Sequence, residues 1–451
     1  MATASSSGLS SALCGGADTI VARATPAGRG ALAVIRVSGP GTQAVAQRVC
    51  PAVAGLAGLA GWRVRRAALY GAAKEHLEDA VVITYRGPRS YTGEDMVEVI
   101  LHGSPFLTEA VIDAAVAAGA RRALPGEFTR RAVANGKLDL VQAEAVNDLI
   151  RADVAWQARL AREQLTGALS ERFVELREAL VGLLALFEGA LDFPPHEVTV
   201  GQEEVARELG RCRRLIAQLL ATAGAGLCIR DGVRATILGP PNAGKSTLFN
   251  WLCGAERAIV SPHPGTTRDV LEAELDLEGV RVMVQDTAGL RSSGDEVEEE
   301  GMRRAMGAAA SASVIVLLWA MDDESPPPEA PAGAAVLRVR SKSDMASGEI
   351  DHSGWLPVSI RTGEGTDTLR RHLVGLVSGE IADLGSEIAI AERHRRALER
   401  AQNELAACDL ERPELAAEAV RWALAAVGEL TGEVGSEEVL DQVFGAFCIG
   451  K

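Results

Sequence analysis

One short segment constrains the fold of this chain more than any other. Residues 239–246 read GPPNAGKS; they follow an apolar, strand-like run at Val233–Leu238 and precede a helical pattern at Thr247–Leu252. The glycines permit a tight loop whose backbone N–H groups can surround phosphates at the start of a helix. In such a loop Lys245 supplies positive charge to the β- and γ-phosphates, and Ser246 offers a hydroxyl ligand to Mg²⁺. The segment predicts a P-loop nucleotide-binding domain of the α/β class.

The motifs that sense the γ-phosphate follow in the order that a GTPase requires. Residues 264–269 read PGTTRD and supply Thr267, which can sense the γ-phosphate through Mg²⁺. Residues 271–284 alternate around a glycine and predict a hairpin. The hairpin leads into DTAG, where Asp286 can reach Mg²⁺ through water and Gly289 can meet the γ-phosphate.

A guanine-specific motif, SKSD at 341–344, follows the strand-like run Val336–Val339. Asp344 can accept a pair of hydrogen bonds that guanine donates and adenine cannot, so the motif selects GTP over ATP. Ser341 stands where such a motif usually has asparagine, and its shorter side chain predicts a weaker contact with the P-loop. The Pro-rich segment 322–334 shows no helix pattern, although a crossover between parallel strands normally contains a helix. We expect a trimmed domain with an intact catalytic half.

The residue after DTAG is unusual. Many GTPases have a glutamine there to orient the attacking water, whereas this chain has Leu290, which cannot form a side-chain hydrogen bond. Another group must place the water and neutralise charge in the transition state. The candidates are Arg268, the acidic run Asp295–Glu300, and a cation held near Asn242. Taken by itself, the acidic run is more typical of a solvated helix start.

The remainder of the chain shows two other sequence patterns, one strand-like and one helical. Short β-branched runs between Gly and Pro predict an α/β domain, whereas Phe173–Phe187 places apolar residues at helical spacing. The helical pattern returns after the nucleotide-binding motifs. We expect a multidomain α/β plus all-α protein in which an inserted P-loop domain interrupts a helical domain. The expected divisions are a flexible leader at 1–17, an α/β domain at 18–126, helical parts at 127–230 and 377–451, and the inserted domain at 231–376.

Charge and cysteine usage restrict the partners and the compartment. The formal net charge is −15, which argues against holding nucleic acid through a broad basic face; a local patch or a partner protein would have to grip RNA. The seven cysteines form no C-x-x-C pair, so neither a disulfide framework nor a zinc site is indicated and a reducing cytoplasm fits best. The longest apolar run, Val314–Met321, is strand-sized, so we expect no membrane span.

Several further segments are ones that a generic GTPase has no reason to contain. They read DTIVA at 18–22, PAGRG at 26–30, YTGED at 91–95, PGEFTRR at 125–131, NGKLDLVQAEA at 135–145 and FCIGK at 447–451. With these segments, the chain from about Asp18 to its last residue resembles the MnmE (TrmE) family of tRNA-modification GTPases.

The resemblance implies a three-part molecule and a reaction. An N-terminal domain similar to folate-binding domains would form a homodimer and hold 5-formyl-tetrahydrofolate, and a helical domain would carry a Ras-like G domain. With MnmG (GidA), a partner that carries FAD, family members add a carboxymethylaminomethyl group to C5 of the wobble uridine of certain tRNAs. The G domains would pair when GTP and K⁺ are bound, and the partner would hold most of the tRNA.

The resemblance also implies roles for particular residues. Glu298 would position the attacking water, with Arg268 and Lys245 as further catalytic residues and K⁺ in place of an arginine finger. Mg²⁺ would be held by Ser246 and Thr267, and K⁺ by Asn242, Ser261, His263 and Thr266. The folate would contact Arg36, Glu98, Lys137 and Lys451. The residues expected to contact GTP are Asn242, Ala243, Gly244, Lys245, Ser246, Thr247, Ser261, Pro262, His263, Pro264, Gly265, Thr266, Thr267, Asp286, Thr287, Ala288, Gly289, Ser341, Lys342, Asp344, Ser359, Ile360 and Arg361.

Without the resemblance, the folate residues have plainer interpretations. Arg36 and Glu98 each interrupt an apolar strand run, which places each on the face opposite the buried one, where most charges are surface or edge residues. Lys137 would be a surface lysine at a helix start. Cys448 is a weak candidate nucleophile, because no His or Arg near it in the sequence would activate it.

Two other functions stay open. A regulatory or ribosome-assembly GTPase would act only as a switch and would share all the nucleotide motifs, but it gives no reason for residues 18–126 or for the Cys-Ile-Gly-Lys end. A folate-binding or one-carbon-transfer protein with a vestigial nucleotide domain would fit the change at Ser341. GTP turnover and folate binding distinguish these possibilities.

Overall fold

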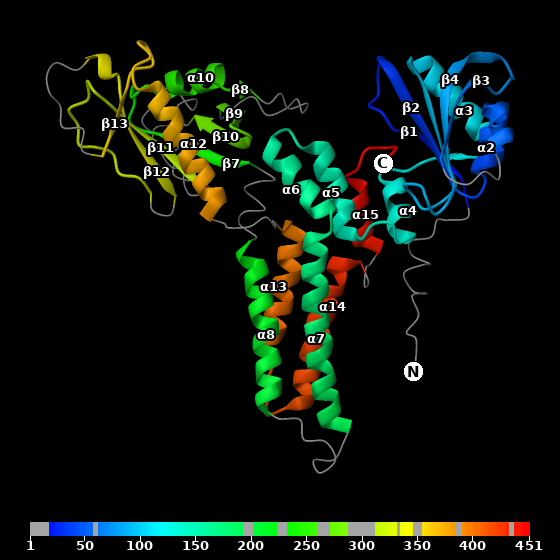
Figure 1. The fold of residues 1–451 in the computed structure, drawn as a ribbon. Helices are drawn as coiled ribbons and strands as arrows, with labels where there is room; N and C mark the ends of the chain where they lie inside the picture. Colours follow the sequence, from blue (N-terminus) through cyan, green and yellow to red (C-terminus); the bar gives the residue numbers. More distant parts are fainter. Residues whose placement is uncertain are drawn as a thin grey trace, which may run out of the picture. The chain divides into compact units, whose positions relative to one another are not determined.

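The computed structural model describes residues 18–56, 62–192, 202–222, 232–258, 271–286, 312–331, 334–345, 354–383, 390–432 and 437–451 (Figure 1). By their contacts the residues divide into two compact units. The first unit combines residues 1–147, 165–209 and 403–451, and the second combines residues 148–164 and 210–402. Parts of the expected helical domain therefore fall in both units, and the expected domain boundaries stay predictions. Among the described helices, none is long and apolar enough to cross a membrane.

The N-terminal part of the first unit is a six-stranded sheet with the strand order β3-β4-β5-β2-β1-β6. Strands β1 and β6 run parallel, and the other neighbours are antiparallel. The strands are β1 Ile20–Arg23, β2 Gly30–Ser38, β3 Arg63–Tyr70, β4 His76–Tyr85, β5 Met96–Gly103 and β6 Arg121–Arg122. The helices α2 (Thr42–Val49) and α3 (Pro105–Ala117) and the short 3₁₀ helix η1 (Pro51–Leu56) bury one face of this sheet.

Side-chain alternation decides which strand residues reach the other, open face. On β2 the buried residues Ile35 and Val37 lie in the core under the helices, so Arg36 between them points to the open face. On β5 the same alternation turns Glu98 to the open face. The short β-branched runs of the sequence, Ala31–Val37, Ala80–Tyr85 and Met96–Leu101, lie within β2, β4 and β5 as expected. The sequence patterns did not indicate β1, β3 or β6.

Helices occupy the rest of the first unit and the ends of the second. They are α4 Glu127–Ala134, α5 Leu140–Arg151, α6 Ala155–Leu165, α7 Ala168–Asp192, α8 Gln202–Ala221, α13 Glu392–Ala406, α14 Pro413–Thr431 and α15 Glu437–Gly445. In the first unit α7 packs along α14. The apolar residues at helical spacing between Phe173 and Phe187 are buried, which confirms the expected seam of this helix. Helix α7 ends at Asp192, and a pair of prolines follows in the sequence after one further residue.

The end of the chain lies against the N-terminal domain within the first unit. Phe444 and Phe447 pack in a small core with Leu140 of α5. Beyond them, Ile449 forms an antiparallel bridge with Pro125. This arrangement brings Gly450 and the residue after it to the open face of the sheet.

The second unit contains a seven-stranded sheet with the order β13-β12-β11-β7-β10-β9-β8. The strands are β7 Val233–Leu238, β8 Arg257–Ala258, β9 Leu271–Leu277, β10 Val280–Asp286, β11 Val314–Ala320, β12 Ala335–Ser341 and β13 Leu356–Val358, and the helices are α10 Lys245–Ala255, α12 Thr366–Asp383 and the 3₁₀ turn η3 Ser343–Met345. Strands β13, β12, β11, β7 and β10 are parallel, and β9 forms the expected hairpin with β10. A core shared by this sheet, α10 and α12 holds the domain together.

Two features distinguish this sheet. The described residues 321–331, which leave β11 toward β12, contain no helix, as the Pro-rich sequence predicts. Helix α6 packs on the sheet's core through Trp156 and Leu160, and the Trp156 backbone N–H donates to the Gly279 carbonyl at 3.2 Å. Because Gly279 lies in the hairpin turn, α6 contacts the turn of the β9–β10 hairpin.

Candidate functional site

The P-loop connects β7 to α10 and has the backbone that its glycines predict. Gly239 has φ +152°, and a Cβ there would lie 2.5 Å from the Leu318 carbonyl oxygen, so a larger residue does not fit. Gly244 caps α10 in the left-handed conformation. The Lys245 Nζ donates to the carbonyls of Gly239 and Pro240, each at 2.8 Å, so the ammonium lies across the loop where the phosphates of a nucleotide would be held.

The expected magnesium ligands fit this edge of the sheet as far as the structure describes them. Asp286 is fully buried at the end of β10, opposite Ile237, which precedes the P-loop by two residues. Ser246 lies in the first turn of α10 with an exposed side chain. A carboxylate at the end of β10 and a hydroxyl in the first turn of α10 are the kind of oxygen ligands that Mg²⁺ prefers.

The guanine motif follows β12 and is tied to the P-loop. Ser341 is buried, and its Oγ donates to the Ala243 carbonyl at 2.6 Å. The hydroxyl thus makes the contact to the P-loop that we expected to be weak. Lys342 pairs with Asp322 at the end of β11, with an Nζ–Oδ2 distance of 2.8 Å.

Asp344, the residue expected to select guanine, is already held from the neighbouring strand end. Ser359 Oγ donates to its Oδ1 at 2.6 Å, and Arg361 donates to its Oδ2 at 2.5 and 2.9 Å. The hydrogen bond from Ser359, followed by that from Arg361, outweighs the effect of desolvation and lowers the pKa of this carboxyl. Ser359 and Arg361 therefore lie beside Asp344, and Ile360 lies between them in the sequence.

The remaining candidates of the nucleotide site lie outside the described residues. They are Ser261, Pro262, His263, Pro264, Gly265, Thr266, Thr267, Arg268, Thr287, Ala288, Gly289, Leu290 and Glu298. Of the expected potassium ligands, the structure describes Asn242, an exposed loop residue with φ +63°. The water-positioning and potassium roles therefore stay predictions.

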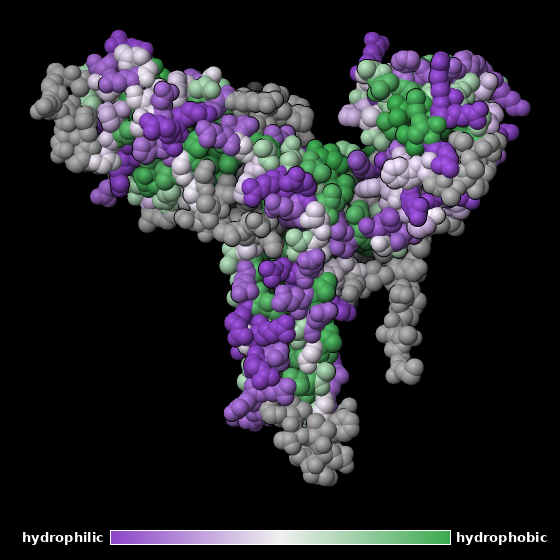
Figure 2. All heavy atoms as spheres, in the orientation of Figure 1, coloured by the Kyte–Doolittle hydropathy of each residue, from purple (hydrophilic) through white to green (hydrophobic). Residues whose placement is uncertain are grey.

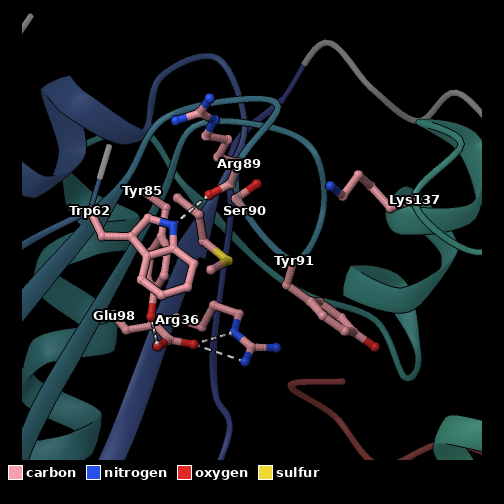
Figure 3. Close-up of a pocket in the computed structure, with 9 residues that line it drawn as sticks. Arg36, Trp62, Tyr85, Arg89, Ser90, Tyr91, Glu98 and Lys137 are labelled. Atoms are coloured by element: carbon pink, nitrogen blue, oxygen red, sulfur yellow. Dashed lines mark hydrogen bonds and ion pairs between the residues drawn. The ribbon is translucent and has the colours of Figure 1, made fainter. Parts of the chain in front are cut away.

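A second candidate site lies on the open face of the N-terminal sheet (Figure 3). Arg36 and Glu98 are register partners on the adjacent strands β2 and β5. Their side chains form an ion pair in which Nη2 lies 2.8 Å from Oε1, and they are 12% and 14% exposed. Tyr85 from β4 donates its hydroxyl to Glu98 Oε2 at 2.8 Å. Burial, then the hydrogen bond and charge of Glu98, raise the pKa of Tyr85 to about 12, so its hydroxyl stays a donor at neutral pH.

The Arg36 guanidinium is fixed from several sides. Its Cζ lies 5.1 Å from the ring centroid of Tyr91 and 5.5 Å from that of Phe128, within cation–π range. Its Nη1 donates to the Gly450 carbonyl at 3.4 Å. An arginine held by an ion pair, two rings and a carbonyl is in place before a ligand arrives, which reduces the entropy lost on binding.

All the expected folate residues gather here. Arg36, Glu98 and Lys137 line one pocket of about 750 Å³, a size typical of small-molecule sites. Lys451 is close enough to respond to Arg36 and Glu98. Burial lowers the pKa of Lys451 below the ordinary 10.5, Arg36 lowers it further, and Glu98 acts in the opposite direction. Arg36 and Glu98 lie on β2 and β5, the two central strands of the sheet, and so they are not edge-strand residues.

Sequence reasoning did not assign several other residues that line the pocket. They are Trp62, Tyr85, Arg89, Ser90, Tyr91 and Met96. Strand alternation could have indicated Tyr85, which shares a face with residues two and four positions before it on β4, and Tyr91 belongs to the YTGED segment. Cys448 is exposed and is not among the residues that line this pocket.

A buried network of ion pairs joins elements next to the pocket. Arg131 of α4, 5% exposed, pairs with Asp18, Glu94 and Glu127. Burial alone would raise the pKa of Glu127, but hydrogen bonds from Arg121, from the Leu124 N–H and from Arg131 lower it overall. This network ties α4 and β6 to the loop that carries Tyr91.

These arrangements define the class of protein. A parallel sheet with a P-loop, a carboxylate at the adjacent strand end and a guanine motif along its carboxyl edge is the catalytic half of a P-loop GTPase, here in one chain with a pocketed N-terminal domain. Comparisons then define the family. A family model described as the GTP-binding protein TrmE N-terminus matches residues 19–137, and one described as the MnmE helical domain matches residues 140–448.

Curated relatives match nearly the whole chain. A tRNA modification GTPase MnmE of Xanthomonas campestris pv. campestris (strain 8004) is 41% identical over 447 residues, which cover 96% of this chain and 99% of the relative. One of Thermus thermophilus is 42% identical over 447 residues, with the same shares, and one of Gluconacetobacter diazotrophicus is 43% identical over 439 residues, covering 96% and 98%. The chain belongs to the MnmE (TrmE) family and is a GTP hydrolase.

Solved structures resemble this chain less closely. The G domain of the T. maritima FeoB iron transporter is 22% identical and covers 34% of this chain and 99% of its own, with a TM-score of 0.24.

Proposed function

We propose that this protein is a potassium-dependent GTPase that takes part in tRNA modification. With a flavin-dependent partner of the MnmG (GidA) kind, it adds a carboxymethylaminomethyl group to C5 of the wobble uridine of certain tRNAs. Membership of a family whose curated relatives are named tRNA modification GTPases supports this function. The observation that carries it is the cluster of Arg36, Glu98 and Lys451 in the N-terminal domain, because a GTPase that acts only as a switch has no use for such a pocket.

The ligand of that pocket is 5-formyl-tetrahydrofolate. A pterin ring presents adjacent N–H donors, which suit a carboxylate such as Glu98, and aromatic rings such as Tyr91 suit its flat face. The carboxylates of a folate suit a pocket lined by more cations than anions. The residues that would hold it are Arg36, Glu98, Lys137 and Lys451, and it supplies a one-carbon unit.

Equilibrium binding of 5-formyl-tetrahydrofolate tests this site. Arg36→Ala removes the ion pair with Glu98, so we expect binding to weaken by at least tenfold, because a charge-assisted interaction is worth about 1.5–3 kcal/mol. Arg48→Ala is the matched control, since Arg48 is exposed on α2, which covers the other face of the sheet. Equal affinity of both variants, or no binding by the unmodified protein, would contradict the assignment.

In this proposal Ser246 and Thr267 hold Mg²⁺, and Asn242, Ser261, His263 and Thr266 hold K⁺. K⁺ supplies positive charge to the transition state in place of an arginine finger, and Glu298 positions the attacking water, which Leu290 cannot do. GTP turnover should be several-fold faster in K⁺ than in Na⁺ at equal ionic strength. Equal rates of GTP turnover in the two salts would contradict a catalytic role for K⁺.

The protein acts as a homodimer that forms through the N-terminal domain. Figure 2 shows hydrophobic residues gathered on this domain, and Leu32, Val64 and Val81 are 61%, 67% and 38% exposed on its strands. We expect light scattering to give twice the chain mass, and Val81→Lys to shift it toward one chain mass. A monomer at micromolar concentration would argue against the dimer.

The cellular function is tested by mass analysis of wobble uridines in cells that lack the gene. We expect the carboxymethylaminomethyl group to disappear from the affected tRNAs and to return with the intact gene. Unchanged uridines together with intact GTP turnover would favour the rival function, a regulatory or ribosome-assembly GTPase that acts only as a switch.

A further inference from the structure

The outer part of the N-terminal pocket carries positive charge that the described residues of this chain do not neutralise. Arg89 and Lys137 both line the pocket. Neither side chain has a hydrogen bond or an ion pair with a residue in the described part of the chain. By contrast, Arg86 in the same loop as Arg89 is paired with Asp95. Uncompensated cations facing one pocket favour an anionic ligand group between them.

The inner part of the pocket is arranged differently. There Arg36 is neutralised by Glu98, which also accepts from Tyr85. In Figure 3 the Arg89 side chain lies above the Arg36–Glu98 pair and the Lys137 side chain lies to the right, so both cations are separate from that pair. The pocket thus has one end suited to a neutral, hydrogen-bonding ring and another suited to an anionic chain.

The backbone of Arg89 is held in place. The Trp62 Nε1–H donates to the Arg89 carbonyl at 3.0 Å, and the Arg89 N–H donates to the Arg86 carbonyl at 2.8 Å. Trp62 in turn packs edge-on against Tyr85, with ring centroids 5.8 Å apart. The exposed indole therefore connects the inner end of the pocket to the loop that presents the Arg89 guanidinium.

We propose that Arg89, positioned by Trp62 and acting with Lys137, forms a subsite for the glutamyl carboxylates of the folate. The site then prefers folates with a chain of γ-linked glutamates over the monoglutamate, because each added glutamate brings a further carboxylate toward these cations. This inference rests on the proposed function of the pocket as a folate site. It adds a ligand class, the anionic polyglutamyl chain, and a specificity residue, Arg89.

The preference should be moderate and sensitive to salt. Arg89 and Lys137 are both exposed, and exposed charge pairs contribute weakly. We expect the pentaglutamate to bind about fivefold to tenfold more tightly than the monoglutamate at low ionic strength. Since charges in solvent are screened beyond about 8 Å at physiological ionic strength, the ratio should shrink as salt is added.

The test is equilibrium binding of 5-formyl-tetrahydrofolate in its monoglutamate and pentaglutamate forms to the full-length chain. Arg89→Ala should reduce the preference to less than twofold, mainly by weakening the pentaglutamate. Arg89→Lys should retain most of it, because the charge stays. The matched control is again Arg48→Ala, which removes one positive charge from the other side of the sheet and should leave the preference unchanged.

The outcomes separate this subsite from the folate site itself. Equal affinity of the unmodified protein for the two forms would overturn the subsite and leave the folate site intact. A preference that persists in Arg89→Ala would also overturn it. If neither form binds, both proposals are overturned. Loss of preference in Arg48→Ala as well would show a nonspecific charge effect, which is a result against Arg89.

Discussion

Replacing Gly450 by alanine should detach the end of the chain from the N-terminal domain. Gly450 has φ +97°, a conformation that costs an L-residue about 1–2 kcal/mol. A Cβ there would lie 2.1 Å from the carbonyl oxygen of Arg23 and 2.8 Å from its carbonyl carbon. Arg23 belongs to β1, which pairs with β2 and lies between β2 and β6 in the sheet. The strand cannot give way, so the end of the chain must move.

The movement has a calculable consequence for the pocket. It removes the Gly450 carbonyl from Arg36 and takes Lys451 away from the Arg36–Glu98 pair. Losing one charge-assisted interaction with the ligand corresponds to about 1.5–3 kcal/mol, or roughly 10- to 150-fold in the dissociation constant. Global stability should fall much less, because Phe444 and Phe447 remain packed in their small core.

The assay is calorimetric binding of 5-formyl-tetrahydrofolate beside thermal unfolding by circular dichroism. Gly445→Ala is the matched control, because a Cβ at Gly445 meets nothing within 4 Å. We expect the control to bind as the unmodified protein does. Gly450→Ala with unchanged affinity would refute the reasoning, and so would a loss of affinity explained entirely by a large drop in melting temperature.

Three further predictions concern other parts of the structure. Glu127→Ala removes the most buried of the three carboxylates that pair with Arg131 and should cost about 2 kcal/mol in the free energy of unfolding. Because the pKa of Glu127 in the folded protein is lowered, its contribution is present above the unfolded pKa and is lost as pH falls through the folded pKa, so the difference from the unmodified protein should shrink in acid. Ser341→Ala removes the donor to the Ala243 carbonyl and should weaken GTP binding about threefold to tenfold, measured with a fluorescent analogue. Because the pKa of Lys451 is lowered, folate affinity should fall with rising pH before a free lysine would deprotonate, and Lys451→Arg should move this fall to higher pH.

Each of these predictions has a contrary result. A destabilisation by Glu127→Ala that stays constant down to pH 3 would show that its ionised form contributes nothing. GTP affinity unaffected by Ser341→Ala would show that the contact to Ala243 does not shape the guanine site. A folate affinity that stays level up to the pH range of an ordinary lysine would remove Lys451 from the set of charges that bind the ligand.

The nucleotide site illustrates how far local sequence reaches. Gly239 and Gly244 both have positive φ, so these glycines set the conformation of the P-loop locally. Lys245 is the next residue in the chain, so its position at the loop also follows from the local sequence. The interpretation of Ser341 required the tertiary structure, because the carbonyl that accepts its hydrogen bond belongs to Ala243. That residue lies in the P-loop, far from Ser341 in the sequence. Spacing along the chain did not reveal that a serine could reach it.

The N-terminal pocket illustrates the opposite case. Alternation placed Arg36 and Glu98 on the unburied face, and on that evidence alone each was a surface charge. Their antiparallel register makes them partners, and the docking of Gly450 against β1 brings Lys451 to them from the far end of the chain. No periodicity in the sequence encodes such an encounter.

The sequence by itself determined the class of fold, the P-loop and its ligand chemistry, because these depend on backbone conformations and side chains that are neighbours in the chain. The tertiary structure alone decided that Arg36 is paired and held between rings, and that Arg89 and Lys137 line the same pocket with no side-chain partner among the residues that the structure describes. The physical reason is that burial, pairing and pKa depend on which groups come within a few ångströms of one another. In this protein those groups come from strands, loops and a chain end that are far apart in the sequence.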